Sequence, residues 1–262
     1  MSDEQGSGEV RSEVDGRVLK ITIANAQQRN AVTPDMMHQL SDALTELDEN
    51  PDLWAGVICA EGDHFTSGLD MAKFFAPGAE PKPIPVDKVD PLGLTKRCRK
   101  PVVTAVQGIC YTVGVEIMLA GDIVVAADDV RFCQMEAKRG IAPLGGAHFR
   151  YLTRAGWGDA MYHLLLCDEF GASEAHRIGL VQEVVAPGEQ VERAMELART
   201  IAKNAPIGIQ ATKAAANSFI AEAEKAAIAA IPEIREKVMK SQDMMEGIAS
   251  LMQRRPAEFK GQ

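Results

Sequence analysis

Glu116 is a carboxylate in a run of apolar side chains, "YTVGVEIMLAGDIVVAA" at residues 111 to 127. A helix formed by this segment would have no polar stripe and would be buried nearly all round, so we expect Glu116 to be buried with it. Burying an unpaired carboxylate costs free energy, so the group should be protonated, paired, or part of a functional site. A structural salt bridge, or a helix end that reaches solvent, would explain this segment equally well.

A second carboxylate, Glu136, follows the next strand-like segment in "RFCQMEAKRGIAPLGG". The exit of a strand into a loop is where α/β folds usually carry their site residues. The alternative is an exposed acidic side chain that faces Lys138 and Arg139, and from Glu136 alone this alternative is the stronger one. Two carboxylates in one site could act as a general acid and a general base.

Two turns could supply hydrogen-bond donors to an oxygen atom that becomes negatively charged. In "GDHFTSGLDM", residues 62 to 71, a strand ends, glycines permit a tight turn, and "LDMAKFF" is expected to start a helix. Backbone N–H groups near Leu69 would then be free and point outward. "TVGVE" is a second turn into a helix, and together the two turns could form an oxyanion hole with two donors. Alone, the first motif is weak, because any strand-to-helix turn with glycines resembles it.

Alternating strands and helices are expected to position these residues. Residues 18 to 23, "VLKITI", alternate apolar and polar side chains after a "DG" turn, which predicts the second strand of a hairpin. Thr33 and Pro34 are typical of a helix start, and the apolar residues after them recur at spacings of three and four. Residues 56–62, 101–108 and 122–133 are expected to be strands, with a compact helix between the last two. This order predicts an α/β domain.

Two regions do not follow this alternation. "APGAEPKPIPVDKVDP", residues 76 to 91, holds five prolines, which exclude regular structure and predict a mobile surface segment, either a lid or a linker. From about Pro187 the pattern is helical almost without interruption, with breaks at Pro206 and Pro232. Such a tail needs a surface to pack on, which is either its own domain or another subunit.

Composition excludes several classes of partner and site. The 262 residues carry a formal net charge of -9 without a local cluster of basic residues, so nucleic acid is not an expected partner. No stretch is long and apolar enough to cross a bilayer, and the start "MSDEQGSGEV" is polar and acidic, so we expect a cytoplasmic protein with no membrane partner. Scattered cysteines and histidines predict neither disulfides nor a metal site. Nucleotide-binding glycine motifs and a G-x-S-x-G elbow are missing as well.

Six stretches of the chain, taken in order, resemble the enoyl-CoA hydratase/isomerase (crotonase) superfamily. They are "QQRNAVTPDMMHQL", "GDHFTSGLDM", "PVVTAVQGICYTVGVEIMLAGDIVVAA", "RFCQMEAKRGIAPLGG", "ASEAHRIGLVQEVV" and "SQDMMEGIASLMQRRPAEF". The resemblance implies an α/β fold with a spiral core of repeated ββα turns at residues 9 to 190, after a disordered N-terminus at residues 1 to 8. It also implies a helical region at residues 191 to 262 that forms homotrimers, often paired into hexamers.

The resemblance further implies an acyl-CoA thioester as ligand, with coenzyme A as part of the substrate and no permanently bound cofactor. The thioester carbonyl oxygen would be held by the backbone amides of Leu69 and Val113. In hydratases of this family both catalytic glutamates are present, and here they fall on Glu116 as the base and Glu136 as the acid. The residues expected to contact CoA or the acyl group are Gln28, Arg29, Ala31, Ser67, Gly68, Asp70, Met71, Leu144, Phe259 and Lys260.

The expected function is therefore that of an enoyl-CoA hydratase, a hydro-lyase that adds water across the 2,3 double bond. An isomerase, a thioester hydrolase or a ring-processing enzyme built on the same fold is one alternative, because fold and site plan are shared by many reactions. A catalytically silent acyl-CoA-binding subunit is the other. The presence of both glutamates favours the hydratase over the isomerase and argues against a silent protein.

Several positions depart from the family pattern. Thr112 and Val113 stand where two glycines are common, and Leu144 replaces another glycine. Arg29 takes a place that is apolar in many members, and position 72 is alanine where a lysine is frequent. Added side-chain volume at Val113 and Leu144 is expected to narrow the acyl pocket, which predicts an unusual substrate.

Overall fold

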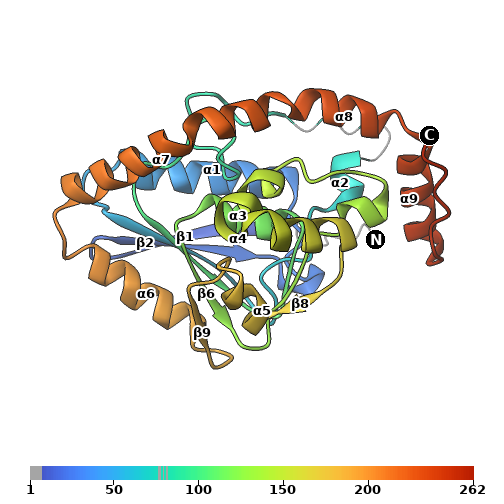
Figure 1. The fold of residues 1–262 in the computed structure, drawn as a ribbon. Helices are drawn as coiled ribbons and strands as arrows, with labels where there is room; N and C mark the ends of the chain where they lie inside the picture. The colour runs from blue at the N-terminus through green and yellow to red at the C-terminus, as the bar shows by residue number, and fades with distance from the viewer. Residues whose placement is uncertain (1–7, 76–77, 79, 81) are drawn as a thin grey trace.

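The computed structural model of the chain describes residues 8–75, 78, 80 and 82–262 and shows a mixed α/β fold (Figure 1). Residues 1–7, which the sequence assigns to a disordered N-terminus, lie outside the described residues. The larger sheet of the described part has six strands in the order β1-β2-β3-β4-β6-β9. Their bounds are β1 (Glu9–Asp15), β2 (Val18–Ala24), β3 (Ala55–Ala60), β4 (Val102–Val106), β6 (Ile123–Ala127) and β9 (Glu183–Val185).

The hairpin predicted from the "DG" turn is confirmed, because β1 and β2 pair antiparallel with Asp15 opposite Val18. The other neighbours in this sheet are parallel, and parallel strands need crossover connections. One crossover is α1 (Pro34–Glu49). Thr33 is its N-cap residue, so the predicted helix start is confirmed. The Thr33 hydroxyl accepts a hydrogen bond from the Met36 N–H at 3.2 Å, which satisfies one of the free donors of the first turn.

A second, smaller sheet places the two segments that carry the glutamates next to each other. It consists of β5 (Ile109–Tyr111), β7 (Arg131–Cys133) and β8 (Phe170–Gly171), in the order β5-β7-β8. β5 and β7 are parallel, with Tyr111 beside Cys133, so their carboxyl ends lie next to each other. β5 leads into α3 (Val113–Ala120), the predicted compact helix, and β7 leads into the short 3-10 helix η2 (Glu136–Arg139).

The segment at residues 122–133 was expected as strand, and it contains two strands in two different sheets. β6 lies in the large sheet and β7 in the small one, with a turn at Asp128 and Asp129 between them. Both halves are apolar and rich in residues that favour strands, so the pattern alone does not show that the chain changes sheet.

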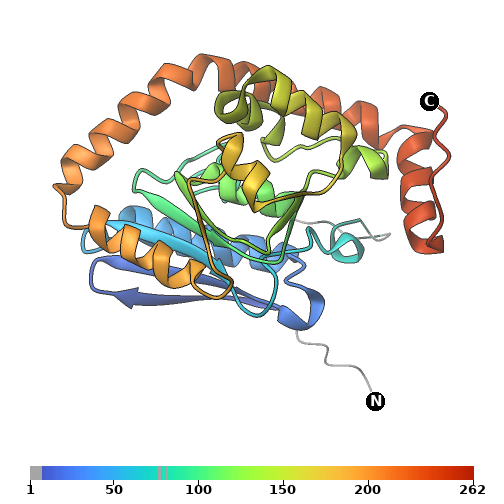
Figure 2. The ribbon, with the colours of Figure 1, turned by 60° about the horizontal axis from the view of Figure 1, so that its bottom comes forward.

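Helices cover both faces of the large sheet. Because side chains alternate along a strand, Leu19, Ile21 and Ile23 pack toward the α1 face. Val18 and Val57 point the other way and pack against α6 (Gln190–Ile201). Figures 1 and 2 show α6 on the opposite face of the sheet from α1. α6, assigned from the sequence to the helical region that begins at residue 191, therefore packs on the sheet.

The remaining C-terminal helices lie outside these layers. They are α7 (Pro206–Ala229), α8 (Ile231–Met239) and α9 (Gln242–Gln253), and Pro206 and Pro232 stand at helix starts, so the predicted breaks are confirmed. α7 and α8 arch over the body, and α9 stands at its end (Figures 1 and 2). None of the described helices combines the length and apolar character that crossing a bilayer requires.

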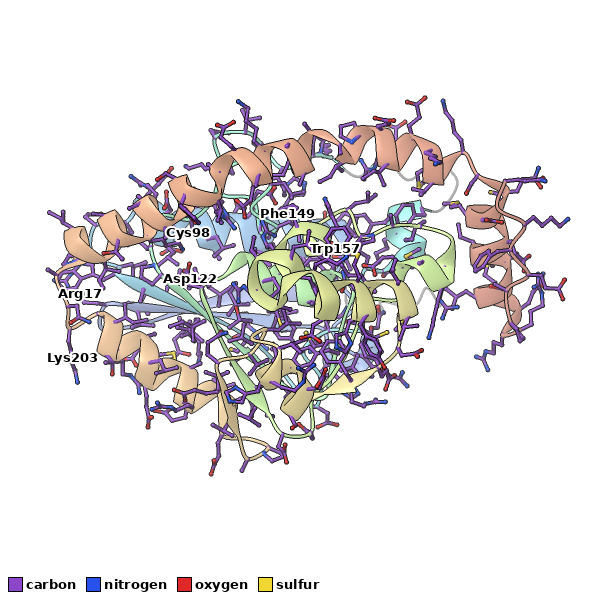
Figure 3. The ribbon with its side chains drawn as sticks, in the orientation of Figure 1. Arg17, Cys98, Asp122, Phe149, Trp157 and Lys203 are labelled. Atoms are coloured by element: carbon purple, nitrogen blue, oxygen red, sulfur yellow. The ribbon has the colours of Figure 1, made fainter. Side chains whose placement is uncertain are left out.

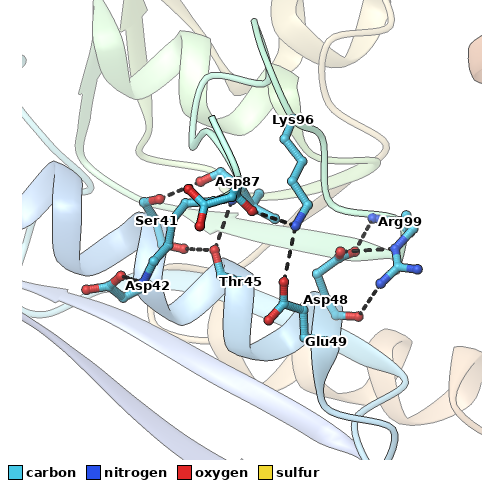
Figure 4. A network of polar contacts seen from close by, with 10 residues as sticks. Ser41, Asp42, Thr45, Asp48, Glu49, Asp87, Lys96 and Arg99 are labelled. Atoms are coloured by element: carbon cyan, nitrogen blue, oxygen red, sulfur yellow. Dashed lines mark hydrogen bonds and ion pairs between the residues drawn. The ribbon is translucent and has the colours of Figure 1, made fainter. Parts of the chain in front are cut away.

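The proline-rich segment at residues 76–91 has no helix or strand among its described residues, as predicted. The prediction of a surface segment is wrong for Val89 to Pro91, which are buried. Ser41 on α1 donates a hydrogen bond to the Val89 carbonyl at 2.6 Å, and the Val89 N–H donates to the Thr45 hydroxyl at 2.9 Å. Figure 4 shows this network continuing through Lys96 and Arg99 to other side chains of α1. Such contacts between distant segments leave no periodic pattern in the sequence.

Three short helices and the 20-residue helix α4, which is kinked at Gly156, complete the described part of the chain. They are η1 (Ala26–Gln28), α2 (Met71–Phe75), α4 (Ala147–Leu166) and α5 (Ala172–Arg177). α2 begins two residues after Leu69, so the turn into a helix predicted at "GLDM" is confirmed.

Candidate active site

Glu116 is buried on α3, as the apolar surroundings predict, with 4% of its surface exposed. Its Oε1 accepts hydrogen bonds from the N–H groups of Gly145 at 2.7 Å and Ala147 at 3.2 Å. Within the described residues Glu116 forms no ion pair, so neither a structural salt bridge nor a solvent-exposed helix end accounts for it. Backbone amides hold the carboxylate in place and leave Oε2 without a protein donor in the described part.

Gly145 makes this approach possible. A β-carbon at this position would clash with Oε2 and with the carboxyl carbon of Glu116. The glycine therefore lets the backbone of the "LGG" segment come close enough to donate to the carboxylate. This requirement is one of space, because Gly145 does not adopt a positive φ.

Glu136 is also buried, with 7% of its surface exposed, and it is the first residue of η2. The alternative of an exposed residue facing Lys138 is wrong, since Lys138 pairs with Asp168 at 2.6 Å. Glu136 Oε1 accepts a hydrogen bond from Gln134 Nε2 at 3.2 Å. Its Oε2 is buried and has no hydrogen-bond partner in the described part of the chain, so this oxygen is available to a ligand or a water.

The two glutamates bind protons more tightly than ordinary carboxyl groups. Burial raises the pKa of Glu116 to about 7, and its two backbone hydrogen bonds and the charge of Arg150 limit that rise. Burial and then the negative charge of Glu116 raise the pKa of Glu136 to about 8. Because the negative charge of Glu116 raises the pKa of Glu136, ionisation of one carboxyl group disfavours ionisation of the other, so the pair tends to hold one proton near neutral pH. One group is then ready to accept a proton and the other to donate one.

The two turns expected to form an oxyanion hole pack against each other. Gly68, with φ at 117°, precedes Leu69, and a β-carbon on Gly68 would lie 2.6 Å from the Thr112 hydroxyl oxygen. Val113 is the first residue of α3, so its N–H has no partner within the helix. Neither the Leu69 nor the Val113 N–H donates to a backbone or side-chain acceptor of the described residues.

Thr112 has a backbone conformation that glycine normally occupies. Its φ is 49° and its ψ is -114°, which for a β-branched residue costs about 1–3 kcal/mol. Two hydrogen bonds hold it, from the Thr112 N–H to the Cys133 carbonyl at 2.9 Å and from the Glu116 N–H to the Thr112 carbonyl at 3.1 Å. Threonine at this position, where glycine is common in the family, therefore strains the backbone next to the candidate oxyanion hole.

Most residues expected to contact CoA lie on two loops that are joined by hydrogen bonds. The Ser67 N–H donates to the Arg29 carbonyl at 3.0 Å, and the loops are joined again on both sides of Leu69 through Val32. This brings one group of the expected residues to the Leu69 turn. The group consists of Gln28, Arg29, Ala31, Ser67, Gly68, Asp70 and Met71.

The other three expected residues lie elsewhere. Leu144 is half-buried and directly precedes Gly145, so it is close to Glu116. Phe259 and Lys260 belong to the C-terminal segment, where the Lys260 N–H donates to Asp243 at 2.7 Å near the start of α9. The two loops that hold the other expected CoA contacts do not include these two residues.

The sequence analysis did not identify two residues that shape the site. Asn30 is fully buried and donates to the carbonyls of Glu61 and His64, which fixes the two loops around Leu69. Arg150 is 2% exposed and donates to the Gly145 carbonyl at 3.2 Å. A charged residue between Phe149 and Tyr151 is the same signal that drew attention to Glu116. It could have predicted a buried guanidinium.

Metal binding has no support in the described residues, where no three histidine, cysteine, aspartate or glutamate side chains are grouped as a metal ion would require. All five cysteines are free and buried, as expected for small core residues. The site therefore offers two buried carboxyl groups with raised pKa values and two backbone donors without an acceptor in the described residues.

Comparison with known proteins gives consistent matches over nearly the whole chain. The family model described as enoyl-CoA hydratase/isomerase matches residues 13–262. An enoyl-CoA hydratase of Mycobacterium tuberculosis, EchA19, is 30% identical over 248 residues, which are 93% of this chain and 93% of that protein.

Two solved structures have the same fold. A probable enoyl-CoA hydratase/isomerase from Mycobacterium abscessus is 40% identical, with a TM-score of 0.76 over 97% of this chain and 98% of the other. A carnitinyl-CoA hydratase from Mycobacterium avium is 31% identical, with a TM-score of 0.88 and the same coverage of the two chains, 97% and 98%. The resemblance stated from the sequence is confirmed.

Proposed function

The chain belongs to the enoyl-CoA hydratase/isomerase family and is an enzyme of the hydratase type, and from this premise we propose that it adds water across the 2,3 double bond of an enoyl-CoA thioester. The observation that carries the proposal is the pair of buried glutamates: backbone amides hold Glu116 Oε1, Glu136 Oε2 has no partner in the described part of the chain, and burial raises both pKa values. A hydration needs both a proton acceptor and a proton donor, and this pair supplies both near neutral pH.

In the proposed reaction the backbone N–H groups of Leu69 and Val113 bind the thioester carbonyl oxygen. Ionised Glu116 takes a proton from water as the water oxygen bonds to the β-carbon, and the double bond becomes an enolate whose oxygen carries the charge. The two amides stabilise that charge, and loss of one such donor typically costs about a hundredfold or more in rate. Protonated Glu136 then gives its proton to the α-carbon, so that one water has been added.

A panel of enoyl-CoA thioesters tests this function directly. We expect the absorbance of the conjugated thioester to fall while the product gains the mass of one water. An unchanged mass would indicate an isomerase, and free CoA would indicate a thioester hydrolase. No change with any thioester, together with saturable binding, would indicate a silent acyl-CoA-binding protein.

We further propose that Leu144 and Val113 select the acyl group. Val113 is buried at the start of α3 and Leu144 is next to the segment that binds Glu116, so both would border a thioester held between Leu69 and Glu116. Crotonyl-CoA should be turned over weakly, with a distinct preference for another acyl group. The carnitinyl-CoA named for the Mycobacterium avium structure belongs in the panel for this reason.

Leu144→Gly should broaden the acyl preference without unfolding the protein, because it removes a pocket wall and leaves both glutamates in place. The ratio of kcat/KM between two acyl groups should change by about 10- to 200-fold, the discrimination expected when two substrates differ by one methylene group in a hydrophobic pocket. Leu165→Ala, at an exposed position of α4, is the control and should leave the ratio unchanged. A wild-type kcat/KM on crotonyl-CoA near the diffusional ceiling of about 10⁸ M⁻¹s⁻¹ would show that Leu144 and Val113 do not obstruct the acyl pocket.

We also propose a homotrimer, alone or paired into a hexamer. The sequence of α9 puts Met245, Ile248, Leu251 and Met252 on one helix face. In the single chain Ile248 is half-buried, whereas Met245 is 67%, Leu251 40% and Met252 79% exposed. Phe219 on α7 is 91% exposed. Apolar surface of this extent usually marks an interface. Light scattering should give three or six times the chain mass of 28.3 kDa, and a monomer mass at micromolar concentration would contradict the assembly.

A further inference from the structure

A cavity of about 150 Å³ lies between α7 and the body of the protein, at the C-terminal end of α3, whereas the Leu69 turn packs at the start of that helix. Figure 3 shows two of its lining residues, Cys98 and Asp122, beneath α7. The wall contains more positive than negative side chains. The positive side chains are Arg97, Arg150, Arg154 and Lys213, and the negative ones are Asp122 and Glu224.

Two of the four cations have carboxylate partners. Arg97 Nη1 lies 3.0 Å from Glu224 Oε2, and Lys213 Nζ lies 2.5 Å from Asp122 Oδ2. These two pairs account for both of the acidic side chains in the wall. The excess positive charge is therefore carried by the two remaining guanidinium groups.

Among the described residues, Arg150 and Arg154 form no ion pair and donate their hydrogen bonds to backbone carbonyls; the Arg150 guanidinium also lies 4.9 Å from the centre of the Phe149 ring. Arg150 donates to Gly145 and Gly93, each at 3.2 Å. Arg154 donates to Leu119 at 3.1 Å and to Gly121 at 2.8 Å. Carbonyl groups satisfy hydrogen-bond donors but do not neutralise charge, and a buried charge without a counter-ion is costly.

Arg150 also has an unused donor. Its Nε is buried and has no hydrogen-bond partner in the described part of the chain, although only 2% of the residue is exposed. A second guanidinium is close: a β-carbon built on Gly93 would lie 3.1 Å from Arg150 Nη2 and 3.3 Å from Arg97 Nε. Burial, and then the like charge of Arg97, lowers the pKa of Arg150 to about 10. The protein thus holds two guanidinium groups close together at a cavity, and only one of them, Arg97, has a carboxylate partner among the described residues.

We propose that this cavity is a binding site for one small oxyanion of the phosphate, sulfate or carboxylate type. The guanidinium fork matches such anions in shape and charge. A cavity of about 150 Å³ admits an ion of this size and not an acyl-CoA. The cavity is separate from the proposed hydration site, since its wall includes neither the glutamate pair nor the two free amides, although the charge of one wall residue, Arg150, also acts on Glu116.

Water is the competing occupant. Glu224 Oε1 is buried without a partner, as is Arg150 Nε, so a bridging water could satisfy both atoms. A neutral water would leave the charge excess uncompensated. The two occupants make opposite predictions for Glu224, because its carboxylate would help to hold a water but would repel an anion.

Isothermal titration calorimetry with inorganic phosphate, at pH 7.5 and with ionic strength held constant by sodium chloride, tests the proposal. We expect one site per chain with a millimolar or lower Kd, and no competition from CoA. Arg97→Gln should weaken binding by about tenfold or more, because it removes a charge-assisted contact. Glu224→Gln should strengthen binding, because it removes the repelling charge and retains an acceptor for Arg97.

Arg99→Gln is the matched control. Arg99 is two residues from Arg97 but pairs with Asp48 on α1, outside the cavity wall. Its replacement should leave phosphate binding unchanged, and circular dichroism melting should show that each variant is folded. Should Arg97→Gln fail to fold, the tightening in Glu224→Gln still decides the question. No saturable binding up to about 50 mM phosphate, an equal loss in Arg99→Gln, or weaker binding in Glu224→Gln would overturn the proposal.

Discussion

Replacing Glu116 with glutamine should lower the rate of enoyl-CoA hydration by about a hundredfold or more while leaving acyl-CoA affinity nearly unchanged. The reason is that glutamine keeps the shape and the contacts but loses the base. Its carbonyl oxygen can accept the same two hydrogen bonds, from the N–H groups of Gly145 and Ala147, that Glu116 Oε1 accepts. Its amide nitrogen then stands where Oε2 would take the proton of water.

Glu136→Gln should cause a loss of similar size, because the amide cannot protonate the α-carbon. Initial rates at saturating thioester give the change in kcat, and competition with a non-reactive acyl-CoA gives the affinity. Glu192→Gln, an exposed change on α6, is the control for removing a glutamate elsewhere. Turnover near that of the native protein for Glu136→Gln, together with none for Glu116→Gln, would rule out the two-carboxylate mechanism and favour a single-base isomerase.

The burial of Glu116 could be predicted from its own segment, whereas that of Glu136 could not. All neighbours of Glu116 on α3 are apolar, so any folded form of that helix buries it. Glu136 has polar neighbours, and distant contacts bury it. Gly247 of α9 packs so closely on η2 that a β-carbon there would clash with the Arg139 carbonyl. Contacts between segments more than a hundred residues apart leave no signal in the local sequence.

Glycines at strand ends predicted the turns at Leu69 and Val113 and suggested that the two could form one oxyanion hole, and the family resemblance made that pairing specific. Their packing through Gly68 and Thr112 is a property of the folded chain. The buried Arg150 and the attachment of Val89 to α1 were missed for a related reason. Their partners are backbone groups, and any residue type can supply a backbone partner, so even where the sequence signals burial, as for Arg150, it does not indicate the partners.

The pH dependence of kcat/KM provides the strongest test of the proton arrangement. If Glu116 must be ionised, the rate should fall about tenfold per unit as pH drops below about 7, the value to which burial raises its pKa. If Glu136 must be protonated, the rate should fall in the same way as pH rises above about 8. The optimum should therefore lie between these values, and activity at pH 5 should be about a hundredfold lower. A carboxylate base with the ordinary pKa of 4.5 would retain most of its activity there.

The two glutamine variants show which glutamate causes the fall in rate at low pH and which causes the fall at high pH. In Glu136→Gln the alkaline limb should disappear from the residual activity, while the acid limb remains, because glutamine is uncharged like the protonated Glu136 that it replaces. Conversely, Glu116→Gln should lower the pKa of Glu136, since the charge of Glu116 is one of the causes that raise it. An acid limb that stayed near pH 4.5 in the native protein would mean that Glu116 is not the base.

The pH dependence of the free energy of unfolding should reveal the raised pKa values of the two glutamates independently of catalysis. Because both pKa values lie above the ordinary 4.5, the folded protein binds more protons than the unfolded chain between pH 4.5 and about 8. The stabilisation by these protons is complete below pH 4.5 and is lost as pH rises through about 7 and about 8, so the contribution of the pair to the free energy of unfolding falls across this window. Glu116→Gln, which has no proton to lose, should flatten that slope in denaturant titrations at several pH values, and Glu192→Gln should not. An unchanged slope in Glu116→Gln would mean that the folded protein does not raise the pKa of Glu116, and the assignment of base and acid would then have to be given up.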